Sequence, residues 1–148
     1  MEHNVLEAGT VIVHGSAAGF AQQIAVGRHR LTGDEPVPAG GTDTGPDPYG
    51  FLLAALGSCI SITVAMYAQR KQWPVDGITV RLRHSRIHAA DCERCDTTHD
   101  LLDRIDCDVE LTGALTDAQR ARLLEIANKC PVHRTLTSEI QIRSRLWP

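Results

Sequence analysis

Apolar and polar residues alternate along several stretches of the chain, which is the pattern of β-strands that bury one face. Short apolar runs separated by small residues add a hairpin near the N-terminus. Together these patterns predict strands at 11–13, 22–26, 78–83, 105–111 and 140–143, with room for a third strand before the first helix.

A long helix is predicted after a loop rich in glycine and proline at residues 33–48. Asp47 is a suitable N-cap, and Pro48 stands where the first helical turn tolerates proline. The pattern continues to about Lys71, and Pro74 ends it. Because residues from Phe51 to Tyr67 are apolar nearly all round, we expect this helix to be the central element of the core.

A second helix is predicted from Asp117 to about Lys129. Thr116 and Gln119 have the spacing of a capping box at its start. The expected buried stripe consists of Ala121, Leu123, Leu124 and Ala127.

The order of these elements predicts an α+β fold with antiparallel sheet, which excludes a doubly wound nucleotide-binding fold. The 148 residues fit one domain, 1–148. Residues 49–68 carry no charge and are long enough to cross a bilayer. Glycine, serine and threonine interrupt this stretch, and the sequence contains no second long uncharged stretch. A buried helix is therefore favoured over a membrane span.

Composition and charge narrow the function classes. A net charge of −3 gives no general attraction to nucleic acid or to an anionic membrane. The N-terminus lacks the pattern of a signal peptide, so we expect a cytoplasmic protein with reduced thiols. Five cysteines, an odd number, argue against a purely structural disulfide framework. No phosphate-binding loop with its lysine and no Ser-His-Asp elbow motif supports a nucleotide or hydrolase function.

Two cysteines stand at informative places. Cys59 lies within the long apolar helix, and Cys130 precedes Pro131, which favours a new helical start. As small apolar residues, both could simply fill space in the core. Cys107, on the apolar face of a predicted strand, is interpreted as a core residue.

The sequence GGTDTGPDPYGFLLAALGSCISITVAMYAQRKQWP at 40–74, followed by LLEIANKCPVHRTL at 123–136, resembles the OsmC/Ohr family of thiol-dependent peroxide reductases. The resemblance implies an OsmC-like fold, in which antiparallel sheets wrap two central helices of an intertwined homodimer. It also implies that Cys59 is the peroxidatic cysteine and Cys130 the resolving cysteine.

The reaction implied by the resemblance runs through two oxidised cysteine states. The Cys59 thiolate would be oxidised to a sulfenic acid, which Cys130 would convert to a disulfide. An external dithiol or a lipoylated protein would then reduce the pair. The apolar helix around Cys59 favours organic hydroperoxides as substrates.

Activation of Cys59 needs a nearby cation, since an apolar environment raises the pKa of a thiol. The family uses an N-terminal arginine held by a glutamate, and the arginines before the helix are Arg28 and Arg30. The expected glutamate position holds Tyr49 or Gly50 instead. This departure leaves open a non-catalytic OsmC-like binding or scaffold protein.

A third chemistry is suggested by His88, Cys92, Cys95 and His99, which have the spacing H-x3-C-x2-C-x3-H. Thiolates and imidazoles are ligands that zinc prefers. The segment could therefore be a zinc site of a metal-binding protein, an accessory dithiol, or an exposed hairpin loop. His133 and Arg134, after the Cys-Pro step, could line the cysteine site or cap the preceding helix.

Overall fold

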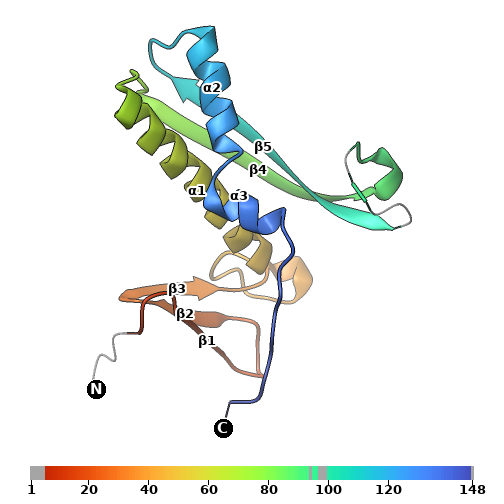
Figure 1. Cartoon of the computed structure of the whole chain (residues 1–148). Helices are drawn as coiled ribbons and strands as arrows, with labels where there is room; N and C mark the ends of the chain where they lie inside the picture. The colour runs from red at the N-terminus through yellow and green to blue at the C-terminus, as the bar shows by residue number, and fades with distance from the viewer. Residues whose placement is uncertain (1–5, 94, 97–99, 148) are drawn as a thin grey trace. The chain divides into compact units, whose positions relative to one another are not determined.

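The computed structural model describes residues 6–93, 95–96 and 100–147, drawn in colour in Figure 1. The chain forms two compact units, divided between Leu52 and Leu53. Antiparallel sheets and helices occur in the order β-β-β-α-β-β-α-α, with two short 3-10 turns between them. The α+β fold with antiparallel sheets is confirmed.

The first unit contains a three-stranded antiparallel meander (Figure 1). Its strands are β1 (Val11–Gly15), β2 (Gln22–Val26) and β3 (His29–Gly33). The turn between β2 and β3 includes Gly27, whose φ of 55° is costly for any residue with a side chain. The hairpin is confirmed, and β3 takes the place left open for a third strand.

The loop after β3 is organised around a buried carboxylate, Asp34. Its Oδ2 accepts hydrogen bonds from the Oγ1 atoms of Thr42 and Thr44, both at 2.7 Å, and from their backbone N–H groups. Its Oδ1 accepts from the N–H of Glu35 at 2.8 Å. These bonds stabilise the ionised form and hold the pKa of Asp34 well below its ordinary value of 3.8. The loop, which includes the 3-10 turn η1 (Val37–Ala39), is therefore closed by one charged group.

Helix α1 (Pro48–Lys71) has the predicted bounds. Asp47 caps it, because its Oδ1 accepts from the N–H of Gly50 at 2.7 Å. One stripe of α1 is buried, and its members are Leu56, Gly57, Ile60, Val64 and Ala68. The helix is long and apolar enough to span a membrane, but the core helix of a soluble protein passes the same test, and this stripe packs inside the second unit.

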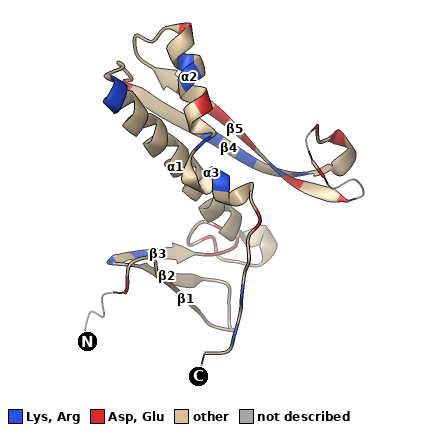
Figure 2. Ribbon diagram, viewed as in Figure 1, with Lys and Arg blue, Asp and Glu red and all other residues tan. Residues whose placement is uncertain are grey.

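A long two-stranded antiparallel ribbon dominates the second unit. It pairs β4 (Gly77–His88) with β5 (Leu101–Thr112) along their whole length, well beyond the predicted alternation. Basic residues of β4 face acidic residues of β5, as Figure 2 shows. Arg83 lies 3.9 Å from Asp106, and Arg86 lies 3.7 Å from Asp103. Such opposite-charge pairs across strands support the observed register.

Two helices follow the ribbon: α2 (Asp117–Ala127) and α3 (Pro131–Leu136). The capping box of Thr116 and Gln119 is present, as predicted. The predicted stripe of α2 was partly wrong. Leu123 and Ala127 are buried and Ile126 joins them, whereas Ala121 and Leu124 are exposed. Packing against α1 and the ribbon selects the face of α2 centred on Leu123. The short apolar pattern of the sequence could not distinguish this face from the adjacent one centred on Leu124.

The predicted C-terminal strand is also wrong. Residues 139–147 have no regular secondary structure, and Ile140 and Ile142 are exposed. Alternation makes a segment suitable for a sheet, but a strand also needs a neighbouring strand edge. Neither described sheet includes this segment.

The core of the second unit joins α1, α2 and the start of α3. Its buried members are Leu56, Ile60, Val64, Ala68, Leu123, Ala127 and Cys130. Side chains from the inner face of the ribbon pack against this cluster, including Leu82 and Cys107. The interpretation of Cys107 as a core residue is confirmed.

Candidate functional site

The thiols of Cys59 and Cys130 meet in the second unit, although the residues are 71 positions apart. Cys59 comes from the middle of α1, and Cys130 stands at the start of α3. Cys59 packs against the core cluster that contains Cys130, its presence raises the pKa of Cys130, and both are free thiols. Since a disulfide requires Cα atoms within about 7 Å, this contact is the arrangement from which one can form.

Cys130 owes its place to the proline that follows it. Pro131 disfavours helical geometry at Cys130, whose φ of −64° and ψ of 149° are extended. The residue therefore becomes the N-cap of α3, and its sulfur accepts the backbone N–H of His133 at 3.3 Å. The predicted new helical start at Pro131 is confirmed.

The environment of Cys130 keeps its thiol protonated. Its side chain is fully buried, with 0% of its surface exposed. Burial, together with the neighbouring Cys59, raises the pKa of Cys130, while the N–H of His133 opposes this effect. A buried, protonated thiol beside a second cysteine suits a resolving residue better than a first nucleophile.

Cys59 has more access to solvent than Cys130. It is half-buried, between the exposed Ser58 and the buried Ile60. Two residues earlier, Gly57 allows the ribbon to approach α1, because a Cβ there would lie 2.6 Å from Cδ1 of Leu82. The mostly apolar surroundings of Cys59 are therefore set by close helix–ribbon packing.

Comparison with protein families matches the chain to a known family. The family model for OsmC-like protein matches residues 41–145, which include both. The chain belongs to the OsmC-like protein family. No curated protein sequence matches it significantly.

Solved OsmC-like structures show the same fold at low sequence identity. An OsmC-like protein from Mycoplasma pneumoniae has a TM-score of 0.67 and 18% identity, covering 86% of this chain and 85% of that one. The organic hydroperoxide resistance protein OhrB of Bacillus subtilis has a TM-score of 0.59 and 18% identity, covering 86% and 89%. A protein from Legionella pneumophila, described as organic hydroperoxide resistance protein OsmC, has a TM-score of 0.62 and 15% identity, covering 86% and 88%.

The candidate activating arginines of this OsmC-like chain lie in its first unit. Arg28 is exposed in the turn between β2 and β3. Arg30, on β3, donates from one guanidinium nitrogen to the carbonyl oxygens of Gly27 and His29, both at 3.0 Å. Asp47, at the start of α1, is engaged as the N-cap of that helix. The role of either arginine stays a prediction.

The Cys-x-x-Cys segment of this family member is in a different chemical state from Cys59 and Cys130. Cys92 and Cys95 form a disulfide with a Cα–Cα distance of 5.6 Å. His88 is exposed at the end of β4, and His99 lies outside the described residues. Among the described residues, no group of three or more His, Cys, Asp or Glu is arranged to hold a metal ion. The zinc site stays a prediction for the reduced segment, since the disulfide offers no thiolate.

Sequence reasoning missed the polar contact that organises the cysteine pair. His133 acts on Cys130 through its backbone N–H rather than through its imidazole. The Cys-Pro step was the available signal, because an N-cap side chain accepts from the third residue of its helix. Cys107 differs from the pair: burial, aided by Asp106 and Asp108, raises its pKa, and its strand keeps it in the core.

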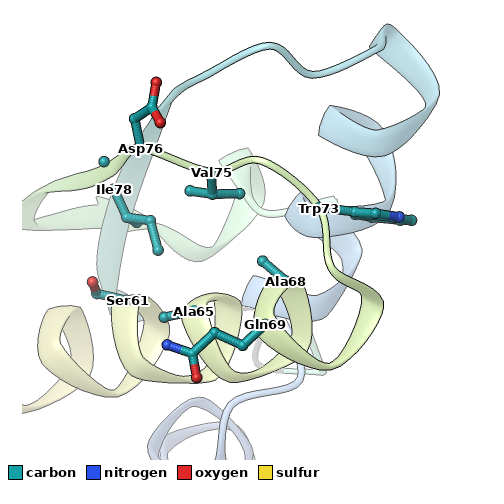
Figure 3. Close-up of a pocket in the computed structure, with 9 residues that line it drawn as sticks. Ser61, Ala65, Ala68, Gln69, Trp73, Val75, Asp76 and Ile78 are labelled. Carbon is teal, nitrogen blue, oxygen red and sulfur yellow. The ribbon is translucent and has the colours of Figure 1, made fainter.

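A cavity of about 220 Å³ lies beside the C-terminal half of α1 (Figure 3). Ala65 and Ala68 of α1 face Val75 and Ile78 across it, with Trp73 at one end. Asp76 is the one ionisable residue among those that line it. Neither Cys59 nor Cys130 lines this cavity, so it is separate from the cysteine site.

Proposed function

We propose that the chain is a thiol-dependent peroxidase that reduces organic hydroperoxides. The observation that carries this proposal is that the free thiols of Cys59 and Cys130 are neighbours in one core, with Cys130 fully buried. The names of the solved relatives from Bacillus subtilis and Legionella pneumophila, both organic hydroperoxide resistance proteins, support the same chemistry.

The first step oxidises Cys59. Its thiolate attacks one oxygen of the hydroperoxide, the O–O bond breaks, and the alcohol leaves after taking a proton. Cys59 is then a sulfenic acid. The sulfur of Cys130 attacks the sulfur of Cys59, a disulfide forms, and the sulfenic oxygen leaves as water.

Two electrons must then return to the pair from outside. We propose a dithiol or a lipoylated protein as the reductant. One of its thiolates attacks the disulfide to form a mixed disulfide, and its second thiol releases the two reduced cysteines. The mostly apolar surroundings of Cys59 favour a hydroperoxide with an organic group over a small polar one.

Thiolate formation at Cys59 needs a positive charge, and we propose that Arg28 or Arg30 supplies it. Neither arginine has the family's glutamate to orient it, because Tyr49 and Gly50 occupy the expected positions. We therefore expect slower oxidation of Cys59 than in relatives that have this glutamate.

We also propose that the protein is a homodimer located in the cytoplasm. Ile62 and Met66 of α1 are exposed to 59% and 64% in the single chain. These side chains, with the alternating C-terminal residues Ile140 and Ile142, supply apolar surface that a second copy would remove from water. The mass of the protein in solution tests the homodimer, and twice the mass of one chain is the expected result.

The decisive experiment maps cysteine oxidation in the reduced protein after brief exposure to one equivalent of cumene hydroperoxide. Rapid formation of a Cys59–Cys130 disulfide is the expected result. A Cys107→Ser variant is the matched control and should form the same disulfide, because Cys107 takes no part in the proposed reaction. If Cys59 stays reduced or reacts no faster than a free thiol, the non-catalytic binding or scaffold function replaces the proposal.

A second candidate function is metal binding by the Cys92–Cys95 segment after reduction. It would need His88 and His99 to complete the four-ligand set. Zinc loading of the reduced protein, followed by metal analysis, tests it. A zinc content near zero removes this candidate, and Cys59→Ser should leave zinc binding intact if the candidate is right.

A further inference from the structure

The disulfide between Cys92 and Cys95 lies at the end of the β4–β5 ribbon, just after the 3-10 turn η2 (Ala89–Asp91) (Figure 1). Cys92 is half-buried and Cys95 is exposed. Exposed disulfides exchange with thiols more readily than buried structural ones.

The ribbon end is closed without this disulfide. His88 pairs with Leu101 in the last position of the ladder. The N–H of Ala89 then donates to the carbonyl of Asp100 at 2.9 Å, and the N–H of Cys92 donates to the carbonyl of Ala89 at 3.1 Å. A crosslink that spans three positions also restricts few conformations of the unfolded chain. A purely structural role therefore does not account for the Cys92–Cys95 disulfide.

The two sulfur-bearing residues line a cavity of about 470 Å³, which is the size of a small-molecule site. Ile87 and Leu102 provide its apolar wall. Its charged members are Asp91, Glu93, Asp103 and Arg104. The cavity therefore brings an exposed disulfide, an apolar surface and an excess of carboxylates together.

Among the residues that the structure describes, the negative charge of this cavity is only partly neutralised. Asp103 contacts His84 at 2.8 Å and Arg86 at 3.7 Å. Arg104 is directed to Asp106, at 2.8 Å. No ion pair within the described residues neutralises Asp91 or Glu93. These carboxylates attract a cationic thiol and repel an anionic one.

Direct exchange with the Cys59–Cys130 pair of the same chain is excluded in this arrangement. Leu82 is the ribbon residue beside Gly57, close to Cys59. The strand from Leu82 to His88 is about 20 Å long at a rise of about 3.3 Å per residue. Disulfide exchange requires sulfur atoms in contact, so the electrons must come from a separate molecule.

We propose that Cys92 and Cys95 form a second redox centre, which is reduced by small cationic thiols of the aminothiol class. The thiolate of one aminothiol attacks a sulfur of the disulfide, the Cys92–Cys95 bond breaks, and a mixed disulfide forms. A second aminothiol attacks the mixed disulfide and leaves both cysteines as thiols. Two aminothiols lose two electrons and become one small disulfide, and the reverse reaction with that disulfide restores the centre.

The test measures exchange on the full wild-type chain, with rapid alkylation and peptide mapping to follow each cysteine. The probes are cysteamine, which is cationic, and 3-mercaptopropionate, which is anionic. The rate of each probe is divided by its own rate with hydroxyethyl disulfide, a neutral reference. At about 10 mM salt we expect the normalised rate of Cys92–Cys95 reduction to be at least fivefold higher for cysteamine than for 3-mercaptopropionate. At about 0.5 M salt this ratio should shrink, because the salt screens the charges.

A charge variant links the preference to the cavity. Asp91→Asn with Glu93→Gln should bring the cysteamine preference down to its high-salt level. Glu110→Gln with Glu139→Gln removes the same net charge from other exposed positions and should keep the preference. Equal normalised rates for the two probes would overturn the proposal. It would also be overturned if both probes reduced hydroxyethyl disulfide and neither reduced Cys92–Cys95. Because every cysteine is mapped separately, the result does not depend on Cys59 reacting with peroxide.

Discussion

The buried thiol of Cys130 lies beside the thiol of Cys59, and the backbone N–H of His133 donates to the same Cys130 sulfur. The two cysteines have unequal environments. Cys59 is half-buried and open to a substrate, whereas Cys130 has no exposed surface and a raised pKa. A Cys59 sulfenic acid would therefore meet Cys130 as its neighbouring thiol.

Replacing the buried cysteine should stop the reaction after its first step. In Cys130→Ser we expect the Cys59 sulfenic acid to accumulate, because no neighbouring thiol condenses with it. Dimedone labelling after one equivalent of cumene hydroperoxide measures this species. The wild-type protein should show little label at Cys59, and Cys59→Ser should show none there. Equal labelling of wild type and Cys130→Ser would argue against Cys130 as the resolving residue.

The raised pKa of Cys130 has a consequence for stability at alkaline pH. Since its folded-state pKa exceeds the ordinary value of 9.0, its stabilising contribution is complete below about pH 9 and is lost as the pH rises through the folded-state pKa. We expect the stability advantage of wild type over Cys130→Ala to shrink as the pH rises above about 9. Urea unfolding in a phosphine reductant measures it. A constant difference across this range would contradict the burial effect.

Asp34 should make the first unit sensitive to acid. Its folded-state pKa lies well below 3.8, so its contribution is present above the unfolded-state pKa and is lost as the pH falls through the folded-state pKa. We expect wild type to lose more stability than Asp34→Asn between about pH 5 and 2. Unfolding curves monitored at Tyr49 or by local hydrogen exchange in residues 34–44 give the measurement. Asp43→Asn, an exposed change of the same charge in the same loop, should follow wild type.

Two adjacent leucines of α2 should differ sharply in their effect on stability. Leu123 is fully buried, and Leu123→Ala should lower the free energy of unfolding by about 2–5 kcal/mol, because it leaves a cavity in the core. Leu124 is 50% exposed, and Leu124→Ala should cost less than about 1 kcal/mol. Urea unfolding of both variants makes the comparison. Equal losses would mean that the observed orientation of α2 is wrong.

Several features of the fold could be predicted because they depend on neighbours in the sequence. The capping of α1 by Asp47, the capping box at Thr116 and the new helix after Cys130 each involve groups within three positions. Backbone preferences and local hydrogen bonds decide such features. The OsmC-like resemblance of residues 40–74 and 123–136 is confirmed by the family match.

Other features depend on partners far away in the chain. Alternation at Ile140 and Ile142 predicts a strand, yet neither described sheet includes that segment. The buried face of α2 depends on how it packs against α1 and the ribbon. Likewise, the spacing of Cys92 and Cys95 allowed zinc or a dithiol, and the disulfide appears only when the chain turns at η2.

The sequence by itself determined where the helices begin, which cysteines have informative neighbours and which family the chain resembles, since each follows from local chemistry or motif wording. Only the tertiary structure decided that Cys59 and Cys130 are neighbours, because closing 71 positions requires the packing of α1, α2 and the ribbon around one core. It also decided which of the two thiols is buried. Burial and contact are properties of the folded surface, and no residue carries them alone.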